Sequence, residues 1–470
     1  MKENNEQGKV ENRVKLFGTD GIRGRANAYP MSPELVLRLG QALGLYFKKH
    51  YEKPRILIGK DTRKSGYMLE QALSSGICSV GVDTFFLGPL PTPGIAYLTR
   101  GMRANAGIVI SASHNAYFDN GIKIFSADGY KLPDEVEEKL ESLVFDSTMN
   151  AHLPTGKAIG TTQRIDDAIG QYAVFLKEQF PKHLTLEGIR IVLDCANGAA
   201  YKVAPKVFEE LGAEVFLIGA NPDGTNINED CGAVYPKRLI KKVKLYKADL
   251  GIAVDGDADR VVVVDEKGEL LDGDEVMAIC GIHYLEQGRL NGKTLVSTIM
   301  SNMGLDIAMG RHQGKVIRTQ VGDRYVVEEM RKNNYNLGGE QSGHMIFRDC
   351  STTGDGILAA LSLLEILIEK GESLHTLKKC MERLPQVLKS IVVDKKVPLP
   401  QLPDLTELIN KMEQSLGKEG RVLFRYSGTE KKARIMIEGS DRDQIESMVE
   451  ELAEKAGSMI KHSPTAISNG

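Results

Sequence analysis

Residues 189–218, IRIVLDCANGAAYKVAPKVFEELGAEVFLI, contain the pattern that decides the fold class. An apolar run, IRIVL, leads into a turn that contains Gly198, and a segment with helical periodicity follows before a second apolar run, AEVFLI. A strand, a helix and a second strand in this order form the unit that joins neighbouring parallel strands. The stretch therefore predicts a mostly parallel sheet with helices packed against its faces.

The same alternation extends to both sides of this stretch. Ser32 and Pro33 fit an N-cap and a first helical residue, and the apolar runs at 55–59 and 106–111 fit buried strands. A polar, proline-rich segment at 392–405 precedes one helix, two strands and a terminal helix, which predict a small α+β domain with an antiparallel sheet. The chain is therefore predicted to be α/β, with three mixed α/β units and one C-terminal α+β unit.

Length and composition limit the class of protein. The 470 residues exceed what one hydrophobic core supports, so several domains are expected. The net charge of −3 provides no general attraction to nucleic acid or to a membrane. The polar N-terminal stretch is unlike a signal peptide, and the six cysteines are scattered without paired spacing. We therefore expect a cytoplasmic protein.

A polar loop at residues 111–125, SASHNAYFDNGIKIF, begins where a predicted strand ends. Open α/β sheets usually bind their ligands at such strand ends. Ser113 in this loop can be approached closely, as a nucleophile or phosphate carrier must be, but an ordinary polar turn has the same composition. The residues alone leave both interpretations open.

Three aspartates alternate in DGDADR, residues 255–260. If Asp255, Asp257 and Asp259 lie close together, they repel one another unless a cation lies between them, and oxygen ligands suit Mg²⁺. A calcium loop of the EF-hand type is an alternative, but Arg260 occupies the position that needs glycine and the flanks are predicted strands. A solvated acidic turn is the third interpretation.

Two further loops contain glycine and polar side chains. GGEQSGH, residues 338–344, could offer Glu340, Ser342 and His344 to a polyhydroxylated ligand. RYSGTEKKAR, residues 425–434, could hold a phosphate dianion by charge-assisted bonds, although its spacing is not that of a Walker loop. Its candidate residues are Arg425, Ser427, Gly428, Thr429 and Arg434. Each loop alone is also typical of a polar turn.

Three arginines, Arg23, Arg63 and Arg324, lie in or beside turns that contain glycine. Arginines in such places are more often exposed and solvated than functional. Taken one at a time, they are therefore predicted to be surface residues.

Taken together and in this order, the four loops resemble those of the α-D-phosphohexomutase superfamily, over about residues 14 to 455. The resemblance implies four domains arranged around a central cleft, each of which contributes one loop. We expect these domains at residues 1–160, 161–260, 261–380 and 381–470. It also implies an enzyme that moves a phosphoryl group between two positions of a hexose.

The resemblance implies a role for individual residues. Ser113 would be the phosphoserine, with His114 beside it, and the three aspartates together with the phosphate on Ser113 would hold one Mg²⁺ ion. Arg260 would offset charge at the transferred group. Lys123 matches the family's general acid/base lysine, and Arg23 matches its N-terminal loop.

Within the superfamily, the substrate follows the sugar loop. GEQSGH is similar to members that act on glucosamine phosphates, whereas GEMSG or GEESG is more usual for mannose and glucose phosphates. The resemblance therefore implies interconversion of glucosamine 6-phosphate and glucosamine 1-phosphate through glucosamine 1,6-bisphosphate, which feeds UDP-N-acetylglucosamine synthesis. Glu340, Ser342 and His344 would contact the sugar, and the 425–434 loop the phosphate that is not reacting.

Several alternatives stay open at this point. The chain could act on mannose or glucose phosphates, or it could be a sugar-phosphate sensor without activity. A homodimer is a candidate assembly, and neither nucleic acid nor a membrane is an expected partner. Ala116, Tyr426 and Lys431 stand where the family usually has prolines, and we expect these changes to affect loop rigidity rather than the reacting groups.

Overall fold

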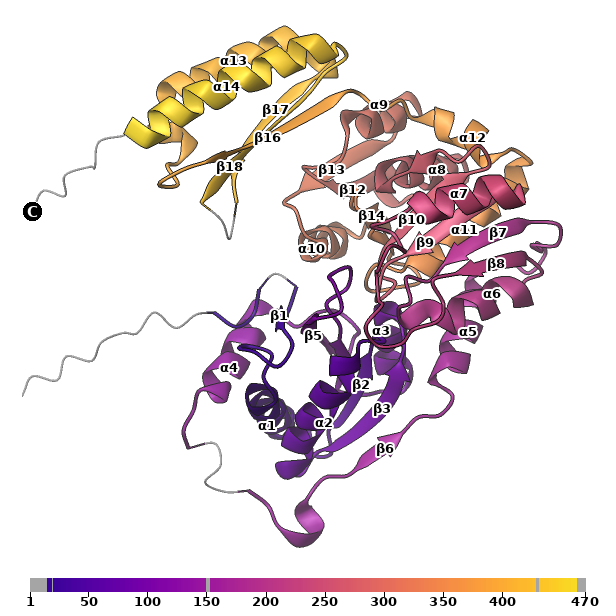
Figure 1. Ribbon diagram of the computed structural model, residues 1–470, viewed down its shortest axis with the longest axis vertical. Helices are drawn as coiled ribbons and strands as arrows, with labels where there is room; N and C mark the ends of the chain where they lie inside the picture. The colour runs from indigo at the N-terminus through magenta and orange to yellow at the C-terminus, as the bar shows by residue number, and fades with distance from the viewer. Residues whose placement is uncertain (1–14, 19, 149–152, 428–430, 463–470) are drawn as a thin grey trace, which may run out of the picture. The chain divides into compact units, whose positions relative to one another are not determined.

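The computed structural model describes residues 15–18, 20–148, 153–427 and 431–462 (Figure 1). Contacts divide the chain into two compact units. The first comprises residues up to 299 together with 317–378, and the second comprises residues 300–316 and those from 379 onward. Within the described ranges, no helix combines the length and the apolar content that crossing a lipid bilayer requires.

The first sheet has six strands in the order β1-β5-β4-β2-β3-β6. They are β1 (Ile22–Arg25), β2 (Arg55–Lys60), β3 (Asp83–Pro89), β4 (Ala106–Ile110), β5 (Asp119–Ser126) and β6 (Thr162–Arg164). The strands β4, β2, β3 and β6 pair in parallel, whereas β5 is antiparallel to both β4 and β1. Every residue of β4 is buried, as its uninterrupted apolar run predicts.

Four helices accompany this sheet: α1 (Pro33–His50), α2 (Lys64–Ser79), α3 (Thr92–Gly101) and α4 (Asp134–Val144). The predicted start of α1 is confirmed, because Ser32 is its N-cap and Pro33 its first residue. The helices α1 and α2 approach closely where glycines face backbone. A Cβ on Gly40 would lie 2.2 Å from the Leu73 carbonyl oxygen, so no larger side chain fits there.

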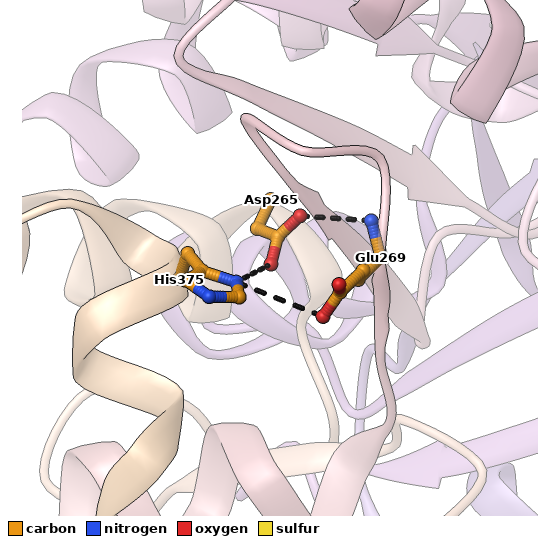
Figure 2. Close-up of side chains that lie close together, drawn as sticks. All are labelled: Asp265, Glu269 and His375. Atoms are coloured by element: carbon orange, nitrogen blue, oxygen red, sulfur yellow. Dashed lines mark hydrogen bonds and ion pairs between the residues drawn. The ribbon is translucent and has the colours of Figure 1, made fainter.

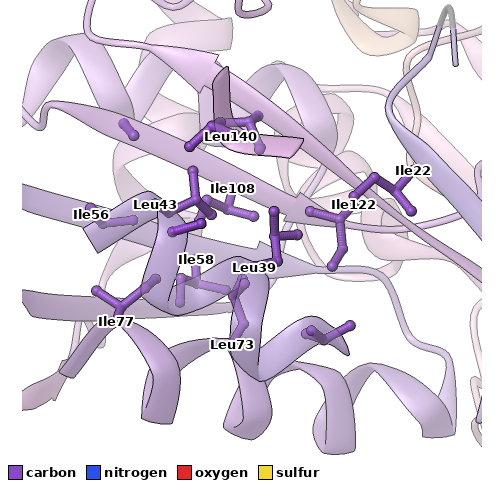
Figure 3. Close-up of a cluster of buried hydrophobic side chains, with 14 of the residues drawn as sticks. Ile22, Leu39, Leu43, Ile56, Ile58, Leu73, Ile77, Ile108, Ile122 and Leu140 are labelled. Atoms are coloured by element: carbon purple, nitrogen blue, oxygen red, sulfur yellow. The ribbon is translucent and has the colours of Figure 1, made fainter. Parts of the chain in front are cut away.

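The core of the first sheet lies between its strands and the helices α1 and α2 (Figure 3). Leu39 and Leu43 of α1 and Leu73 of α2 are fully buried against Ile58 of β2 and Ile108 of β4. Burying such side chains contributes roughly 1.5–3 kcal/mol each. This packing fixes the sheet whose strand ends carry the polar loops.

The second sheet has the order β11-β10-β9-β7-β8. Its elements are β7 (Arg190–Asp194), β8 (Glu214–Ile218), β9 (Leu250–Val254), β10 (Val261–Asp265) and β11 (Leu270–Leu271), with α5 (Ala168–Gln179), α6 (Val203–Glu210) and α7 (Lys237–Tyr246). The stretch 189–218 forms β7, α6 and β8, and the two strands are parallel, which confirms the prediction. The loop 255–260 is the turn of the antiparallel β9–β10 hairpin.

The third sheet has the order β13-β12-β14-β15. Its elements are β12 (Thr294–Thr298), β13 (Lys315–Thr319), β14 (Leu337–Gly339) and β15 (Met345–Phe347), with α8 (Gly273–Glu286), α10 (Asp323–Asn333), α11 (Gly356–Lys370) and α12 (Leu374–Leu377). Short 3₁₀ segments occur at Gly156–Ala158, Ala199–Tyr201, Asn291–Lys293, Lys378–Cys380, Leu399–Gln401 and Gly417–Glu419. The candidate sugar loop is the turn between the antiparallel strands β14 and β15.

The second unit contains an antiparallel sheet in the order β16-β18-β17. Its elements are β16 (Gln386–Val392), β17 (Arg421–Tyr426), β18 (Lys432–Glu438), α9 (Met303–Arg311), α13 (Pro403–Leu416) and α14 (Arg442–His462). The prediction of a C-terminal α+β unit with an antiparallel sheet is confirmed, but that prediction did not include the strand β16. This edge strand mixes polar and apolar residues and contains exposed Leu388 and Val392, so its sequence carries no sign of a buried strand.

Candidate active site

Ser113 lies just beyond the carboxyl end of β4 and is almost fully buried. Its backbone is left-handed, with φ 51°, a conformation that costs a residue with a Cβ about 1–2 kcal/mol. The Ser113 N–H donates to Ser111 Oγ at 2.9 Å, and Ser111 Oγ donates to the buried Asp61 carboxylate at 2.6 Å. These bonds offset the strain and hold the serine in place.

The aspartate loop of the β9–β10 hairpin lies beside Ser113. Ser113 Oγ donates to Asp255 Oδ2 at 2.5 Å. Asp255, Asp257 and Asp259 are all buried, and one carboxylate oxygen from each lies within 4.8 Å of the others. The two loops that the sequence indicated separately therefore meet, although Ser113 and Asp255 are 142 residues apart.

The chemistry of these carboxylates fits a hard divalent cation. Burial, and then the charges of Asp259 and Asp257, raise the pKa of Asp255 to about 8. Asp257 Oδ1 and Asp259 Oδ1 are buried and have no hydrogen-bond partner within the described part of the chain. Unsatisfied buried oxygens are costly, and ligation of an ion such as Mg²⁺ would satisfy them.

Lys123 of β5 supplies a positive charge that faces the same carboxylates. Its Nζ lies 3.1 Å from an oxygen of Asp257, 3.1 Å from one of Asp259 and 3.4 Å from one of Asp20. Burial alone would lower the pKa of Lys123, but these three carboxylates outweigh burial and raise it well above its usual value. Lys123 is therefore a buried ammonium group in direct contact with the acidic cluster.

His114 and two arginines complete the surroundings of Ser113. His114 Nδ1 lies 3.3 Å from Ser113 Oγ and 3.3 Å from Arg260 Nη1. Burial, and then the charges of Arg260 and Arg23, lower the pKa of His114 to about 4, so its ring is neutral. Arg23 pairs with Asp20. An anionic group carried by Ser113 would therefore meet guanidinium charge close by.

The sugar loop contributes two of its three candidate residues to this cluster. Glu340 is buried, and burial raises the pKa of its carboxyl. His344 Nε2 accepts the Gly354 N–H at 3.0 Å, which leaves Nδ1 to face Asp259 Oδ1 at 3.8 Å. Ser342 is exposed in the turn. Glu340 and His344 thus approach the aspartate loop, whereas Ser342 faces solvent.

A chain of charged side chains that the local sequence patterns did not indicate extends from the acidic cluster toward the sugar loop. Lys131 Nζ lies 2.6 Å from Asp20 and 2.8 Å from Asp323. Asp323 lies beside the His344 ring, 3.4 Å from the Nε2 atom that accepts the Gly354 N–H. Asp20 also faces Lys123. Nothing in the local patterns around these residues distinguishes them from surface charges, so only the tertiary contacts reveal the network.

The expectation that Arg63 and Arg324 are surface residues is wrong. Arg63 is fully buried, donates to Asp61 through Nε at 2.8 Å and binds carbonyl oxygens of the Ser113 loop through both Nη atoms. Arg324 is largely buried and pairs with Glu137 at 3.1 Å and with Asp134. A carboxylate partner and backbone acceptors offset the cost of burying each guanidinium.

The candidate phosphate loop belongs to the second unit, and Gly428 and Thr429 lie outside the described residues. Arg425 and Arg434 are register partners on the neighbouring strands β17 and β18. Burial, and then the charge of Arg434, lower the pKa of Arg425. Two like charges opposite each other destabilise a ladder, and an anion bound between them would relieve that repulsion. Ser427, which is buried, donates its N–H to the Lys432 carbonyl at 2.8 Å.

All three residues that stand where the family usually has prolines make hydrogen bonds. Tyr426 donates its hydroxyl to the Val397 carbonyl at 2.7 Å, and the Ala116 carbonyl accepts from Arg63. The Lys431 carbonyl accepts the Val393 N–H at 3.0 Å. Hydrogen bonds hold these loops at the positions where the family usually has prolines.

A second cluster of metal-binding residue types, Asp265, Glu269 and His375, lies in the first unit (Figure 2). Asp265 Oδ2 faces His375 Nδ1 at 3.0 Å and accepts from Lys378 Nζ at 2.6 Å. Asp265 Oδ1 accepts the Lys267 and Glu269 N–H groups at 3.0 and 2.8 Å. The Lys378 ammonium already balances these carboxylates, so the cluster is a clamp between α12 and the β10–β11 hairpin.

Comparison with known families agrees with this geometry. Four phosphoglucomutase/phosphomannomutase family models match successive segments of the chain: alpha/beta/alpha domain I at residues 14–151, domain II at 170–268, domain III at 272–384 and the C-terminal domain at 387–455. The chain therefore belongs to the phosphoglucomutase/phosphomannomutase family, whose members are intramolecular phosphotransferases.

Relatives with more than half of their residues identical indicate a subgroup within this family. Phosphoglucosamine mutase of Citrifermentans bemidjiense is 58% identical over 439 residues, which cover 93% of this chain and 97% of the relative. That of Anaeromyxobacter sp. is 54% identical over 445 residues, which cover 94% and 95%. Within the family, the chain belongs to the phosphoglucosamine mutases.

Solved structures share the fold. A phosphoglucomutase/phosphomannomutase family protein of Burkholderia thailandensis has a TM-score of 0.78 at 22% identity, covering 94% of this chain and 97% of its own. Aspergillus fumigatus N-acetylphosphoglucosamine mutase, solved with GlcNAc-6P and magnesium, has a TM-score of 0.66 at 16% identity, covering 95% and 96%. At these identities the likeness shows the common architecture.

Proposed function

We propose that the protein interconverts glucosamine 6-phosphate and glucosamine 1-phosphate, with Ser113 as the residue that carries the phosphoryl group. The observation that carries this proposal is the 2.5 Å bond from Ser113 Oγ to Asp255, inside a buried triplet of carboxylates. A serine beside acidic groups is a poor site for a dianion unless a cation balances the charge. The identity to phosphoglucosamine mutases supports the amino sugar as substrate.

The transfer consists of two steps of the same kind. The phosphoryl group leaves Ser113 Oγ and bonds to the free hydroxyl oxygen of the sugar phosphate, while the proton of that hydroxyl is released and Ser113 Oγ regains one. The glucosamine 1,6-bisphosphate formed in this way reorients in the site. Its other phosphoryl group is then transferred to Ser113. The family resemblance assigns this proton to Lys123, whose ammonium group is buried next to the aspartates.

Asp255, Asp257 and Asp259 would hold one Mg²⁺, which would supply positive charge to the transferred phosphoryl group. Around this ion, residues of the chain position the transferred phosphoryl group and neutralise its charge. Arg260 lies beside His114 and Ser113, where its guanidinium attracts phosphate oxygens. Positioning and electrostatics of this kind account for most of the rate in phosphoryl transfer.

The family resemblance supports Glu340 as an acceptor of hydrogen bonds from sugar hydroxyl or amino groups, whereas the ring nitrogens of His344 already face Gly354 and Asp259. Ser342 adds an exposed hydroxyl in the same turn. In the second unit, Arg425 and Arg434 offer adjacent charges suited to the phosphate that is not reacting, together with Ser427, Gly428 and Thr429. The specificity for glucosamine over mannose and glucose is tested by comparing kcat/KM for the three sugar phosphates.

The test of the carrier role combines mass spectrometry with kinetics. We expect the intact protein to carry one phosphate that maps to the Ser113 peptide, and Ser113→Ala to lower kcat by at least about 10³-fold because no other hydroxyl replaces the carrier. Ser142→Ala, which removes an exposed serine of α4, is the matched control and should keep full activity. Turnover close to wild type in Ser113→Ala would exclude Ser113 as the carrier, and absence of turnover in the wild type would favour a sensor.

A further inference from the structure

We propose that Asn228 is a positioning residue that holds the Ser113 loop in register with the aspartate loop. This inference rests on the proposed role of Ser113 as phosphate carrier. Asn228 lies in the long connection between β8 and α7, far from every loop that the sequence singled out. It belongs to the segment matched by domain II, as the aspartates do, whereas Ser113 belongs to domain I.

The contacts of Asn228 converge on two peptide groups of the Ser113 loop. Asn228 Nδ2 donates to the Ser113 carbonyl at 2.9 Å and to the Asn115 carbonyl at 3.0 Å. Arg63 Nη2 donates to the same two carbonyls at 2.9 and 2.8 Å. Both lone pairs of each oxygen are thus used, by one donor from each domain.

The aspartate loop packs directly against this junction. A Cβ on Gly256, between Asp255 and Asp257, would lie 2.5 Å from the Ser113 carbonyl oxygen and 3.0 Å from Asn228 Nδ2. The backbone of the metal loop therefore touches the peptide that Asn228 holds. A rotation of the peptide that contains the Ser113 carbonyl would also move Ser113 Oγ relative to Asp255, because the carbonyl and Oγ belong to the same left-handed residue.

The backbone of Asn228 explains why asparagine stands there. Its φ is 58°, a left-handed conformation that asparagine and aspartate tolerate better than most residues. Its N–H donates to the Ala196 carbonyl at 2.8 Å, and its side chain is buried. Asn228 Oδ1 has no hydrogen-bond partner among the described residues. The two Nδ2 bonds alone therefore orient the amide group, because Oδ1 in their place would face two carbonyl acceptors.

A residue that only stabilised the fold would have a different signature. Loss of general stability lowers the fraction of active enzyme and leaves kcat per active site unchanged. Loss of positioning lowers kcat per phosphorylated site, because misplacement of a reacting group by about 1 Å can cost about 100-fold, and it leaves KM almost unchanged. The two roles can therefore be separated kinetically.

The test uses Asn228→Asp, which keeps the shape and the tolerance for positive φ but exchanges the donor for an acceptor. The control is Asn226→Asp, the same change two residues away, where Nδ2 donates to the Asn221 carbonyl in an exposed part of the loop. Asn228→Gly, which also allows positive φ, is the second variant if the aspartate prevents folding. The assay measures kcat and KM for the sugar phosphate, phosphate on Ser113 by mass spectrometry, and the melting temperature.

We expect Asn228→Asp to lower kcat per phosphorylated enzyme by about 10- to 100-fold with KM within about twofold of wild type, and Asn226→Asp to behave as wild type. Wild-type kcat in both Asn228 variants would overturn the inference while leaving the proposed function intact. A loss that matches the unfolded fraction would also overturn it, because Asn228 would then be structural only. A wild-type protein without phosphate on Ser113 and without turnover would instead contradict the proposed function.

Discussion

Replacing Lys123 by methionine removes a charge from the acidic cluster and keeps most of the side-chain volume. In the native protein the Lys123 ammonium lies 3.1 Å from oxygens of both Asp257 and Asp259. Burial raises the pKa of Asp259, but Lys123 first and other charges after it outweigh burial and hold the pKa well below its usual value. Lys123→Met therefore leaves buried carboxylates without their nearest counter-charge.

The size of the effect follows from the two contacts. Breaking a buried ion pair by removing one partner costs about 3–5 kcal/mol. In the absence of divalent cations we therefore expect the melting temperature to fall by roughly 4–7 °C. Two unit charges on the order of 4 Å apart interact by about 4 kcal/mol at an effective dielectric constant of about 20. Lys123→Met removes the ammonium group that competes with the metal ion for the carboxylates. The variant should therefore bind Mg²⁺ at least about tenfold more tightly than wild type.

The assay is calorimetric titration of Mg²⁺ into chelator-treated protein, together with melting curves with and without the ion. The control is Lys139→Met, which removes an exposed lysine of α4 and should change neither quantity. Turnover of Lys123→Met should be at least about 10²-fold lower, because the acid is lost. Unchanged stability without metal, combined with unchanged or weaker Mg²⁺ binding, would refute the reasoning about this cluster.

Two further predictions concern other residues. Burial raises the pKa of Asp355 from 3.8 to about 6, so ionisation costs the native protein about 3 kcal/mol as pH rises from 4 to above 6. The free energy of unfolding of wild type relative to Asp355→Asn, measured in urea, should fall by that amount over this window, and a constant difference would contradict it. Glu340→Gln should raise KM for the sugar phosphate by about 10-fold with a smaller effect on kcat, because a charged hydrogen-bond acceptor is lost. Steady-state kinetics decide this, and an unchanged KM would remove Glu340 from sugar binding.

Local patterns were sufficient for most of the elements. Apolar runs bounded by glycine and proline predicted the strands of the parallel ladders, because a strand covered by helices needs apolar side chains on both faces. The apolar flanks of residues 255–260 likewise predicted strands on both sides of the aspartates, and the structure has a hairpin there. The strand β16 was not predicted, because an edge strand with exposed side chains lacks the uninterrupted apolar run of a buried strand.

The sequence by itself determined the fold class, the order of the polar loops and the residue types that each loop offers. Only the tertiary structure decided that Ser113 meets Asp255, that Arg63 is buried, and that Asn228 reaches a loop 115 residues away. The physical reason is the cost of burying polar groups. A buried charge or amide is stable only with particular partners, and the path of the chain through the fold, rather than the neighbouring sequence, determines which partners are within reach.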